Sequence, residues 1–93
     1  MIKSFRDRRT RELFEVGASS GVPQALAWRA VRRLDRLDEI QAVGELRQPR
    51  SFRLHALRAD RAGQFAIAVN RQWRVCFRFE GGHAYDVEFC DYH

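Results

Sequence analysis

The apolar residues of this chain change their spacing once, close to the middle of its 93 residues. In the first half they recur at steps of three and four residues, which is the spacing of one face of an α-helix. From Phe52 onward they alternate with polar residues, which is typical of strands with one buried face. Helices followed by strands predict an α+β fold, in which a short N-terminal strand and a two-helix hairpin pack on one face of an antiparallel sheet.

The helical half carries its own start and stop residues. Residues 2–5 form a short strand with Ile and Phe at its ends, and the oxygens of Asp7 and Thr10 can cap a helix that Gly17 ends. Pro23 suits the first turn of a second, longer helix. Arginines occupy one side of this helix, and its apolar stripe consists of Ala27, Ala30, Val31, Leu34, Leu37 and Ile40.

Four strands follow one another in the second half. Their apolar positions are Phe52 and Leu54, then Phe65, Ile67 and Val69, then Trp73, Val75, Phe77 and Phe79, and finally Tyr85, Val87 and Phe89. Turn residues lie in the connection before each of the last three strands, which predicts an antiparallel meander. The first strand, 2–5, is expected to pair into the same sheet. Because neighbours along a strand point to opposite faces, polar residues should line the face away from the helices, namely Arg53, His55, Arg74, Cys76 and Arg78.

The length and composition predict one compact domain over residues 1–93. A chain of this size buries about 60–70% of the surface that its unfolded form exposes. Its 45% hydrophobic and 12% aromatic content is too high for a disordered chain. No apolar run approaches the roughly 18 residues needed to cross a bilayer, and the charged N-terminus leaves no room for a signal peptide. We therefore expect a cytoplasmic protein with no membrane segment.

Cys76 and Cys90 are the two cysteines of the chain. Two cysteines do not make the disulfide framework of a small secreted protein, and their spacing matches neither a CxxC metal motif nor a redox motif. We predict both to be reduced and structural, and we predict no metal site and no cofactor.

The positive charge is concentrated between residues 47 and 78. This stretch holds eight arginines and one acid, Asp60, so it carries +7 while the whole chain carries +5. Guanidinium pairs bidentately with phosphate and stacks on bases, so an excess of arginine favours a nucleic-acid partner. The alternative is a solvated surface on which the basic residues happen to be arginines. The predicted RNA- or ribosome-binding residues are Arg47, Arg50, Arg53, Arg61, Arg71 and Arg78.

The C-terminus consists of polar residues that a hydrophobic core does not need. The chain ends in Cys90-Asp91-Tyr92-His93 directly after the last predicted strand. This tail should reach the sheet face that carries His55 and Arg74. A sheet covered by helices on one side and lined with Arg, His and Tyr on the other is suited to bind RNA, with Tyr available to stack on a base.

Three segments resemble the HigB, or plasmid maintenance system killer, branch of the RelE/ParE toxin superfamily. They are residues 54–65, residues 72–79 and residues 84–93, and the opening 2–6 matches as well. The resemblance covers essentially the full chain. It implies a small α/β toxin that enters the ribosomal A site and cuts mRNA during translation. It also implies a helix-turn-helix antitoxin of the HigA type as the partner.

Carried over by this resemblance, the catalytic site falls on His55, Arg58, Arg74, Asp91, Tyr92 and His93. RNA cleavage without a metal needs a base for the 2′-hydroxyl proton, a cation for the crowded phosphorane and an acid for the leaving 5′-oxygen. Imidazole can carry the proton and arginine can hold the phosphate charge. Related toxins often have Lys where this chain has Arg58. Because Arg cannot lose its proton at neutral pH, a role of this position in proton transfer is in doubt.

Several alternatives stay open at this point. His55 can be an ordinary strand histidine, Tyr92 can be a packing plug, and Asp91 can simply pair with a neighbouring arginine. His93 is at a chain end, where residues fray. The same fold also carries ParE-like toxins that poison a protein such as gyrase without cutting anything, and a plain RNA- or ribosome-binding module is a third possibility.

Overall fold

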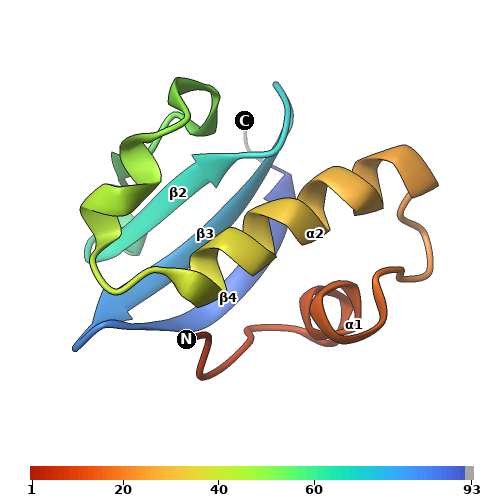
Figure 1. Ribbon diagram of the computed structural model, residues 1–93, viewed down its shortest axis with the longest axis horizontal. Coiled ribbons are helices and arrows are strands. Elements are labelled where there is room, and N and C mark those ends of the chain that lie inside the picture. Colours follow the sequence, from red (N-terminus) through yellow and green to blue (C-terminus); the bar gives the residue numbers. More distant parts are fainter. Residues whose placement is uncertain (92–93) are drawn as a thin grey trace.

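The computed structural model describes residues 1–91, and within this range two α-helices and a four-stranded antiparallel sheet form the fold. The elements are α1 (Arg8–Val16), α2 (Gln24–Glu39), β1 (His55–Ala56), β2 (Gln64–Ala68), β3 (Trp73–Glu80) and β4 (His83–Asp91). The strands lie in the sheet in chain order, so the predicted meander is confirmed. Figure 1 shows α2 lying across the sheet and α1 beside β4. The predicted α+β class is also confirmed.

The N-terminal segment joins the sheet beside β4. Ile2 forms a parallel bridge with Ala84, and Phe5 forms one with Val87. The backbone N–H of Lys3 donates to the Ala84 carbonyl at 2.7 Å. The predicted pairing is therefore confirmed, although the segment forms two separate bridges and not a continuous strand.

Both ends of α1 follow from the sequence. The Asp7 carboxylate accepts hydrogen bonds from the backbone N–H of Thr10 at 2.8 Å and from its hydroxyl at 2.6 Å. Gly17 ends the helix in the left-handed conformation, at φ 88°. The hydroxyl of the buried Thr10 also accepts a hydrogen bond from the Phe89 N–H at 2.8 Å. The cap of α1 thereby fixes the end of β4, which carries Asp91.

The predicted apolar stripe of α2 faces the sheet. Ala27, Ala30, Leu34 and Leu37 are buried, and Ile40 is buried directly after the helix ends. Such a buried leucine typically stabilises a fold by about 2–5 kcal/mol relative to alanine. The stripe packs with side chains of β2, β3 and β4 in one core. None of the helices in residues 1–91 is long and apolar enough to cross a membrane.

The segment before β1 differs from the prediction. It contains two short 3-10 turns, η1 (Val43–Arg47) and η2 (Arg50–Phe52), so a strand that begins at Phe52 is wrong. Phe52 is buried, but its N–H bonds to the Pro49 carbonyl at 3.0 Å. Arg53 ends η2 in the left-handed conformation, at φ 50°. The backbone groups here are satisfied within the turn and are not available to a strand ladder.

The register of the sheet places the large apolar side chains on the helix-covered face. Phe65 pairs with Phe77, and Ile67 pairs with Val75, which in turn pairs with Phe89. Phe77 and Phe89 have no exposed surface. Replacing either with alanine is expected to cost about 3–5 kcal/mol.

A β-bulge in β4 changes the face on which Tyr85 lies. Asp86 has φ 53°, and the pairing of β3 with β4 shifts between the Cys76–Glu88 and Arg78–Tyr85 pairs. The prediction that Tyr85 shares the face of Val87 is therefore wrong. The Tyr85 ring lies beneath the Arg78 guanidinium instead, with 5.2 Å between the ring centroid and Cζ.

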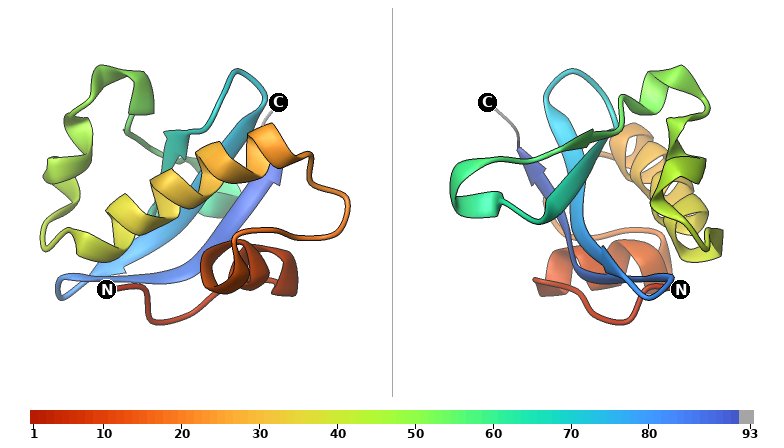
Figure 2. Two further views of the ribbon diagram at one scale, coloured as in Figure 1. Left: turned by 45° about the vertical axis from the view of Figure 1, so that its right-hand side comes forward. Right: turned by 90° about the vertical axis from the view of Figure 1, so that its left-hand side faces the viewer.

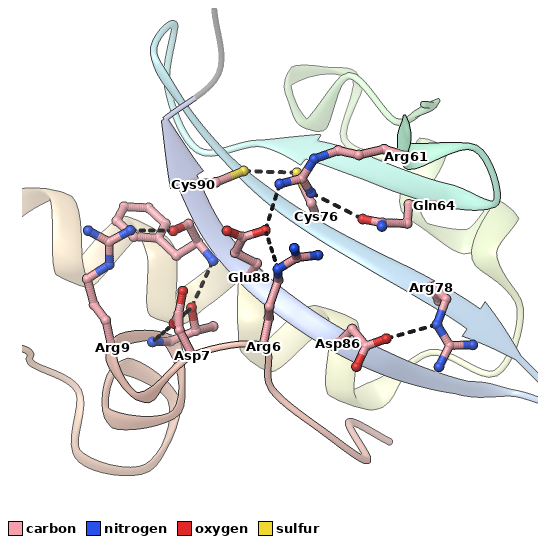
Figure 3. Close-up of polar contacts among 12 residues, drawn as sticks. Arg6, Asp7, Arg9, Arg61, Gln64, Cys76, Arg78, Asp86, Glu88 and Cys90 are labelled. Atoms are coloured by element: carbon pink, nitrogen blue, oxygen red, sulfur yellow. Dashed lines mark hydrogen bonds and ion pairs between the residues drawn. The ribbon is translucent and has the colours of Figure 1, made fainter. Parts of the chain in front are cut away.

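The other face of the sheet is only partly open. Cys76 lies on it as predicted, but it is buried, and so is Ala66, its partner on β2. Figure 2 (right) shows the segment from β1 to β2, which includes the short turn η3 (Ala59–Arg61), on the side of the sheet away from α2. The expectation that Cys76 faces solvent is wrong, because Arg61 from this segment lies over it (Figure 3).

Candidate RNA-binding and catalytic site

The turn between β2 and β3 positions Arg74. The Asn70 side-chain oxygen accepts hydrogen bonds from the backbone N–H groups of Gln72 at 2.9 Å and Trp73 at 2.7 Å, which closes the turn. The Arg74 guanidinium donates to the Asn70 carbonyl and, at 3.2 Å, to the Trp73 carbonyl. The half-buried Arg74 side chain therefore folds toward the turn.

Arg74 lines a hollow of about 830 Å³ between α2, η2 and this turn. Five of the ten lining residues are arginines, and no carboxylate lines the hollow within residues 1–91. Such a surface concentrates positive potential and attracts anions. We call it the arginine hollow; its arginines are Arg29, Arg33, Arg53, Arg71 and Arg74.

Arg33 is the most constrained arginine of the hollow. Its Nε donates to the Ala68 carbonyl at 2.9 Å, and its guanidinium lies 4.6 Å from the centroid of the Phe52 ring. Burial lowers the pKa of Arg33 below its ordinary value, and repulsion from Arg29 and Arg32 lowers it further. The cations here repel one another, so an anion in the hollow would relieve that repulsion.

His55 and Arg58 lie at the opposite edge of the sheet from β4. His55 begins β1, and its ring Nδ1 lies 3.0 Å from the Arg53 carbonyl oxygen. A proton on Nδ1 makes this contact a hydrogen bond and leaves Nε2 as a proton acceptor. His55 pairs with Ala66, which pairs with Cys76, so His55 lies two strands away from β3, the strand that carries Arg74. Arg58 is exposed in the connection that follows β1.

Asp91 ends β4 beside the β2–β3 turn. It pairs with Trp73, and its carboxylate accepts a hydrogen bond from the Gln72 side-chain amide at 3.0 Å. The structure thus brings Asp91 next to the turn that carries Arg71 and Arg74. Tyr92 and His93, which are also predicted site residues, lie outside the described residues.

Two of the predicted RNA-binding arginines form ion pairs with acids of the same face. Arg61 donates to Glu88 at 2.8 Å, and Arg78 donates to Asp86 at 3.0 Å (Figure 3). Arg78 also donates to Glu80. These hydrogen bonds raise the pKa of Arg61 and that of Arg78. We call Arg61 and Arg78 the paired arginines. Their role in RNA binding stays a prediction.

Arg47 and Arg50 are exposed on the 3-10 turns. Arg47 ends η1 and Arg50 begins η2. Neither residue lines the arginine hollow. Their role in ribosome binding also stays a prediction.

The two cysteines contact each other across β3 and β4. The Cys76 and Cys90 sulfurs lie 3.0 Å apart, and neither forms a disulfide (Figure 3). The contact lowers the pKa of Cys76, because the Cys90 thiol can donate to a Cys76 thiolate, and it raises the pKa of Cys90. Cys90 precedes Asp91 directly, so this pair supports the end of β4.

Sequence reasoning placed Arg29 and Arg33 on the arginine side of the second helix but did not count them among the candidate site residues. Their spacing of four residues places them on one stripe of α2. The sequence does not show that the β2–β3 turn packs against that stripe, so the hollow appears only in three dimensions. Within residues 1–91, no group of three or more His, Cys, Asp or Glu side chains is placed to hold a metal ion.

Comparisons with known proteins agree with this fold. Residues 3–93 match the model of a family described as the RelE-like toxin of the type II toxin–antitoxin system HigB. The chain is 41% identical to Endoribonuclease HigB of Proteus vulgaris over 93 residues, which is 100% of both chains. It is 29% identical to Toxin HigB-1 of Vibrio cholerae over 85 residues, or 90% of each chain.

A solved structure has the same fold. It is the YoeB–YefM complex from Staphylococcus aureus, matched with a TM-score of 0.63 over 100% of this chain and 98% of that one. At 12% identity this likeness shows the fold alone. From the family model and the full-length similarity, the chain belongs to the HigB-like family of RelE-like toxins of type II toxin–antitoxin systems.

Proposed function

We propose that this toxin is an endoribonuclease that stops growth by cutting mRNA in the ribosomal A site. The observation that carries the proposal is the 41% identity, over the full length, with a protein named Endoribonuclease HigB. The arginine hollow supports it, because its charge suits the phosphates of RNA. Arg74 lines this hollow, where a phosphodiester would be bound, and Asp91 is hydrogen-bonded to Gln72, another lining residue.

The proposed roles follow from the chemistry of each side chain. The 2′-hydroxyl of the target nucleotide attacks the adjacent phosphorus, and the bond to the 5′-oxygen breaks. His55, Asp91 and His93 are the candidates for taking the first proton and supplying the second. Arg74 holds the charge that develops on the phosphorane, and Tyr92 stacks on the target base.

Arg58 supports the reaction through its charge alone. It is exposed on the connection after β1, on the same edge of the sheet as His55. Its guanidinium stays protonated at neutral pH, so it can hold a phosphate but cannot act as a base. We therefore assign proton transfer to the histidines and Asp91.

The partners follow from the family. A type II toxin is encoded with a protein antitoxin, and we propose a helix-turn-helix antitoxin of the HigA type for this chain. The substrate places the toxin in the cytoplasm, on translating ribosomes. The proposed chemistry uses no metal and no cofactor.

Primer extension on mRNA from cells that express the chain tests the proposal. We expect discrete cuts inside translated codons and none in untranslated regions. A toxic chain that leaves mRNA intact but causes DNA breaks would instead be a gyrase poison. A chain that binds ribosomes with neither effect would be a binding module, and either result contradicts the proposal.

A further inference from the structure

Two hollows lie on either side of Arg33, and they differ in charge. The smaller one, of about 440 Å³, contains the acids Asp35 and Glu39 next to its arginines. The arginine hollow contains no acid within the described part of the chain. The acids of the first hollow offset most of its positive charge, whereas among the described residues no carboxylate lines the second, whose positive charge attracts an anion.

Residues from three separate elements form the arginine hollow. Arg29 and Arg33 come from α2, Arg53 ends η2, and Arg71 lies in the β2–β3 turn. Within residues 1–91, none of these four arginines takes part in an ion pair. Several guanidinium groups that converge without acids are typical of a site for phosphate.

Two contacts hold Arg33 in place before any ligand arrives. The Nε bond from Arg33 to the Ala68 carbonyl and the contact with Phe52 fix the Arg33 guanidinium at the wall of the hollow. Arg53 is placed by the left-handed conformation that ends η2. A preorganised cation loses little conformational entropy on binding, so each phosphate contact contributes more to affinity.

We propose that Arg29, Arg33, Arg53 and Arg71 form a phosphate subsite for the RNA backbone next to the linkage that is cut. The inference rests on the proposed function, since it assigns the scissile phosphate to Arg74 and the neighbouring phosphate to the rest of the hollow. The subsite binds the substrate in both its ground state and its transition state. It therefore sets affinity and not the rate of the chemical step.

The test uses a short single-stranded RNA that cannot be cut because its target 2′-hydroxyl is methylated. A second RNA carries uncharged methylphosphonates in place of the phosphates that flank the target linkage. The binding of the toxin to each RNA is measured with the RNA free in solution and with the RNA in the A site of programmed ribosomes. The variants are Arg29→Gln and Arg71→Gln, whose side chains are exposed, and the matched control is Arg8→Gln on α1.

We expect each of the two variants to bind the charged RNA about five- to tenfold more weakly, as one lost charge-assisted contact predicts. Binding of the methylphosphonate RNA should not change between these variants and the unaltered toxin. Arg8→Gln should bind both RNAs as the unaltered toxin does. At ribosome concentrations below saturation, Arg29→Gln should cut a normal mRNA more slowly than the unaltered toxin, in proportion to its weaker binding.

Three results would overturn the subsite. One is that Arg29→Gln and Arg71→Gln behave like Arg8→Gln on the charged RNA. Another is that they weaken binding of both RNAs equally. The third is that they lose antitoxin binding and keep RNA binding, which would make the hollow a docking site for an acidic antitoxin segment.

The proposed function is judged separately by whether the unaltered toxin cuts mRNA. Arg33→Lys adds a check on folding, because lysine keeps the charge and loses the guanidinium fork. It should weaken binding of the charged RNA while melting within a few degrees of the unaltered toxin. If Arg33→Lys changes neither the melting temperature nor the affinity for the charged RNA, Arg33 is not part of the subsite.

Discussion

The arginine hollow and the paired arginines differ in what surrounds them, although both belong largely to the same basic stretch of sequence. In the hollow, five arginines converge with no acid among the described residues. On the face beside β4, Arg61 and Arg78 are each bonded to carboxylates of the same sheet. Arg29, Arg53 and Arg71 of the hollow form no ion pair within residues 1–91, whereas Arg61 and Arg78 must first give up a carboxylate before they can bind an external anion.

Because of this difference, counting arginines and acids along the sequence does not show which arginines are paired with an acid in the fold. The acids that neutralise Arg61 and Arg78 are Glu88, Asp86 and Glu80, and all three come from outside the stretch 47–78. The hollow also includes Arg29 and Arg33 of α2, and both lie outside the stretch 47–78. The proposed RNA-binding surface therefore uses fewer arginines of the basic stretch than the sequence predicts, and it includes two arginines from outside that stretch.

The largest expected effect comes from deleting residues 91–93. The deletion removes three predicted catalytic residues, Asp91, Tyr92 and His93, and leaves the paired arginines in place. Because the Gln72–Asp91 hydrogen bond is exposed, its loss should cost only about 1 kcal/mol. We expect growth inhibition and mRNA cleavage to fall to background while the chain still melts cooperatively and binds its antitoxin.

Toxicity, thermal melting and antitoxin pull-down are compared for the deletion and for Glu15→Gln as control. Glu15 is an exposed acid on α1 whose ion pair is with Arg11, so its replacement should leave toxicity unchanged. A folded deletion that remains fully toxic would contradict the assigned site. An unfolded one would show that the tail is structural.

Arg74→Ala should have the next largest effect. Phosphate charge builds up mainly in the transition state, so loss of its guanidinium should lower the cleavage rate by roughly two to three orders of magnitude. Ribosome affinity should fall much less. Single-turnover cleavage and ribosome binding separate the two quantities, with Arg74→Lys as an intermediate. Equal losses in both would make Arg74 a docking residue like the rest of the hollow.

Local chemistry made parts of this fold predictable. The Asp7 cap, the Gly17 stop and the buried face of α2 depend on residues within one or two helical turns, and all three predictions are confirmed. Phe52 was misassigned because a buried aromatic fits a strand and a 3-10 turn equally well. Tyr85 was misassigned because the bulge at Asp86 shifts the alternation by one residue.

The site was predictable to a smaller extent. The predicted meander implies that the end of β4 lies beside the start of β3, and Asp91 does pair with Trp73 there. The arginine hollow was not predictable, because it depends on how α2 packs against a turn far away in the sequence. The roles of Tyr92 and His93 depend on the resemblance to related toxins and stay predictions.

A smaller effect is expected in the salt dependence of RNA binding, which compares the two groups of arginines directly. Arg71→Gln removes a cation that is available to phosphate, so it should flatten the slope of log K against log salt by about one unit. Arg78→Gln removes a cation that Asp86 and Glu80 already neutralise, so the slope should change by much less. Titrations of both variants at several salt concentrations measure this. Equal slopes for the two variants would abolish the distinction between free and paired arginines.

Glu88→Gln should have the smallest effect. It tests the paired arginines by removing the carboxylate that Arg61 binds. Glu88 holds Arg61 at 2.8 Å and lies 3.8 Å from Arg6, so its neutralisation releases positive charge on the face beside β4. The loss of a half-exposed pair should destabilise the fold by only about 0.5–1 kcal/mol.

RNA binding by Glu88→Gln should tighten by roughly two- to fivefold at low salt and return to the unaltered value at high salt, because screening removes the gain. The control is Glu15→Gln, which changes the net charge equally but acts on an exposed pair with Arg11 on α1. If both variants tighten RNA binding alike, net charge alone governs affinity and the position of Arg61 is irrelevant. If only Glu88→Gln does so, Arg61 lies where RNA passes, and Glu88 limits its contribution in the native toxin.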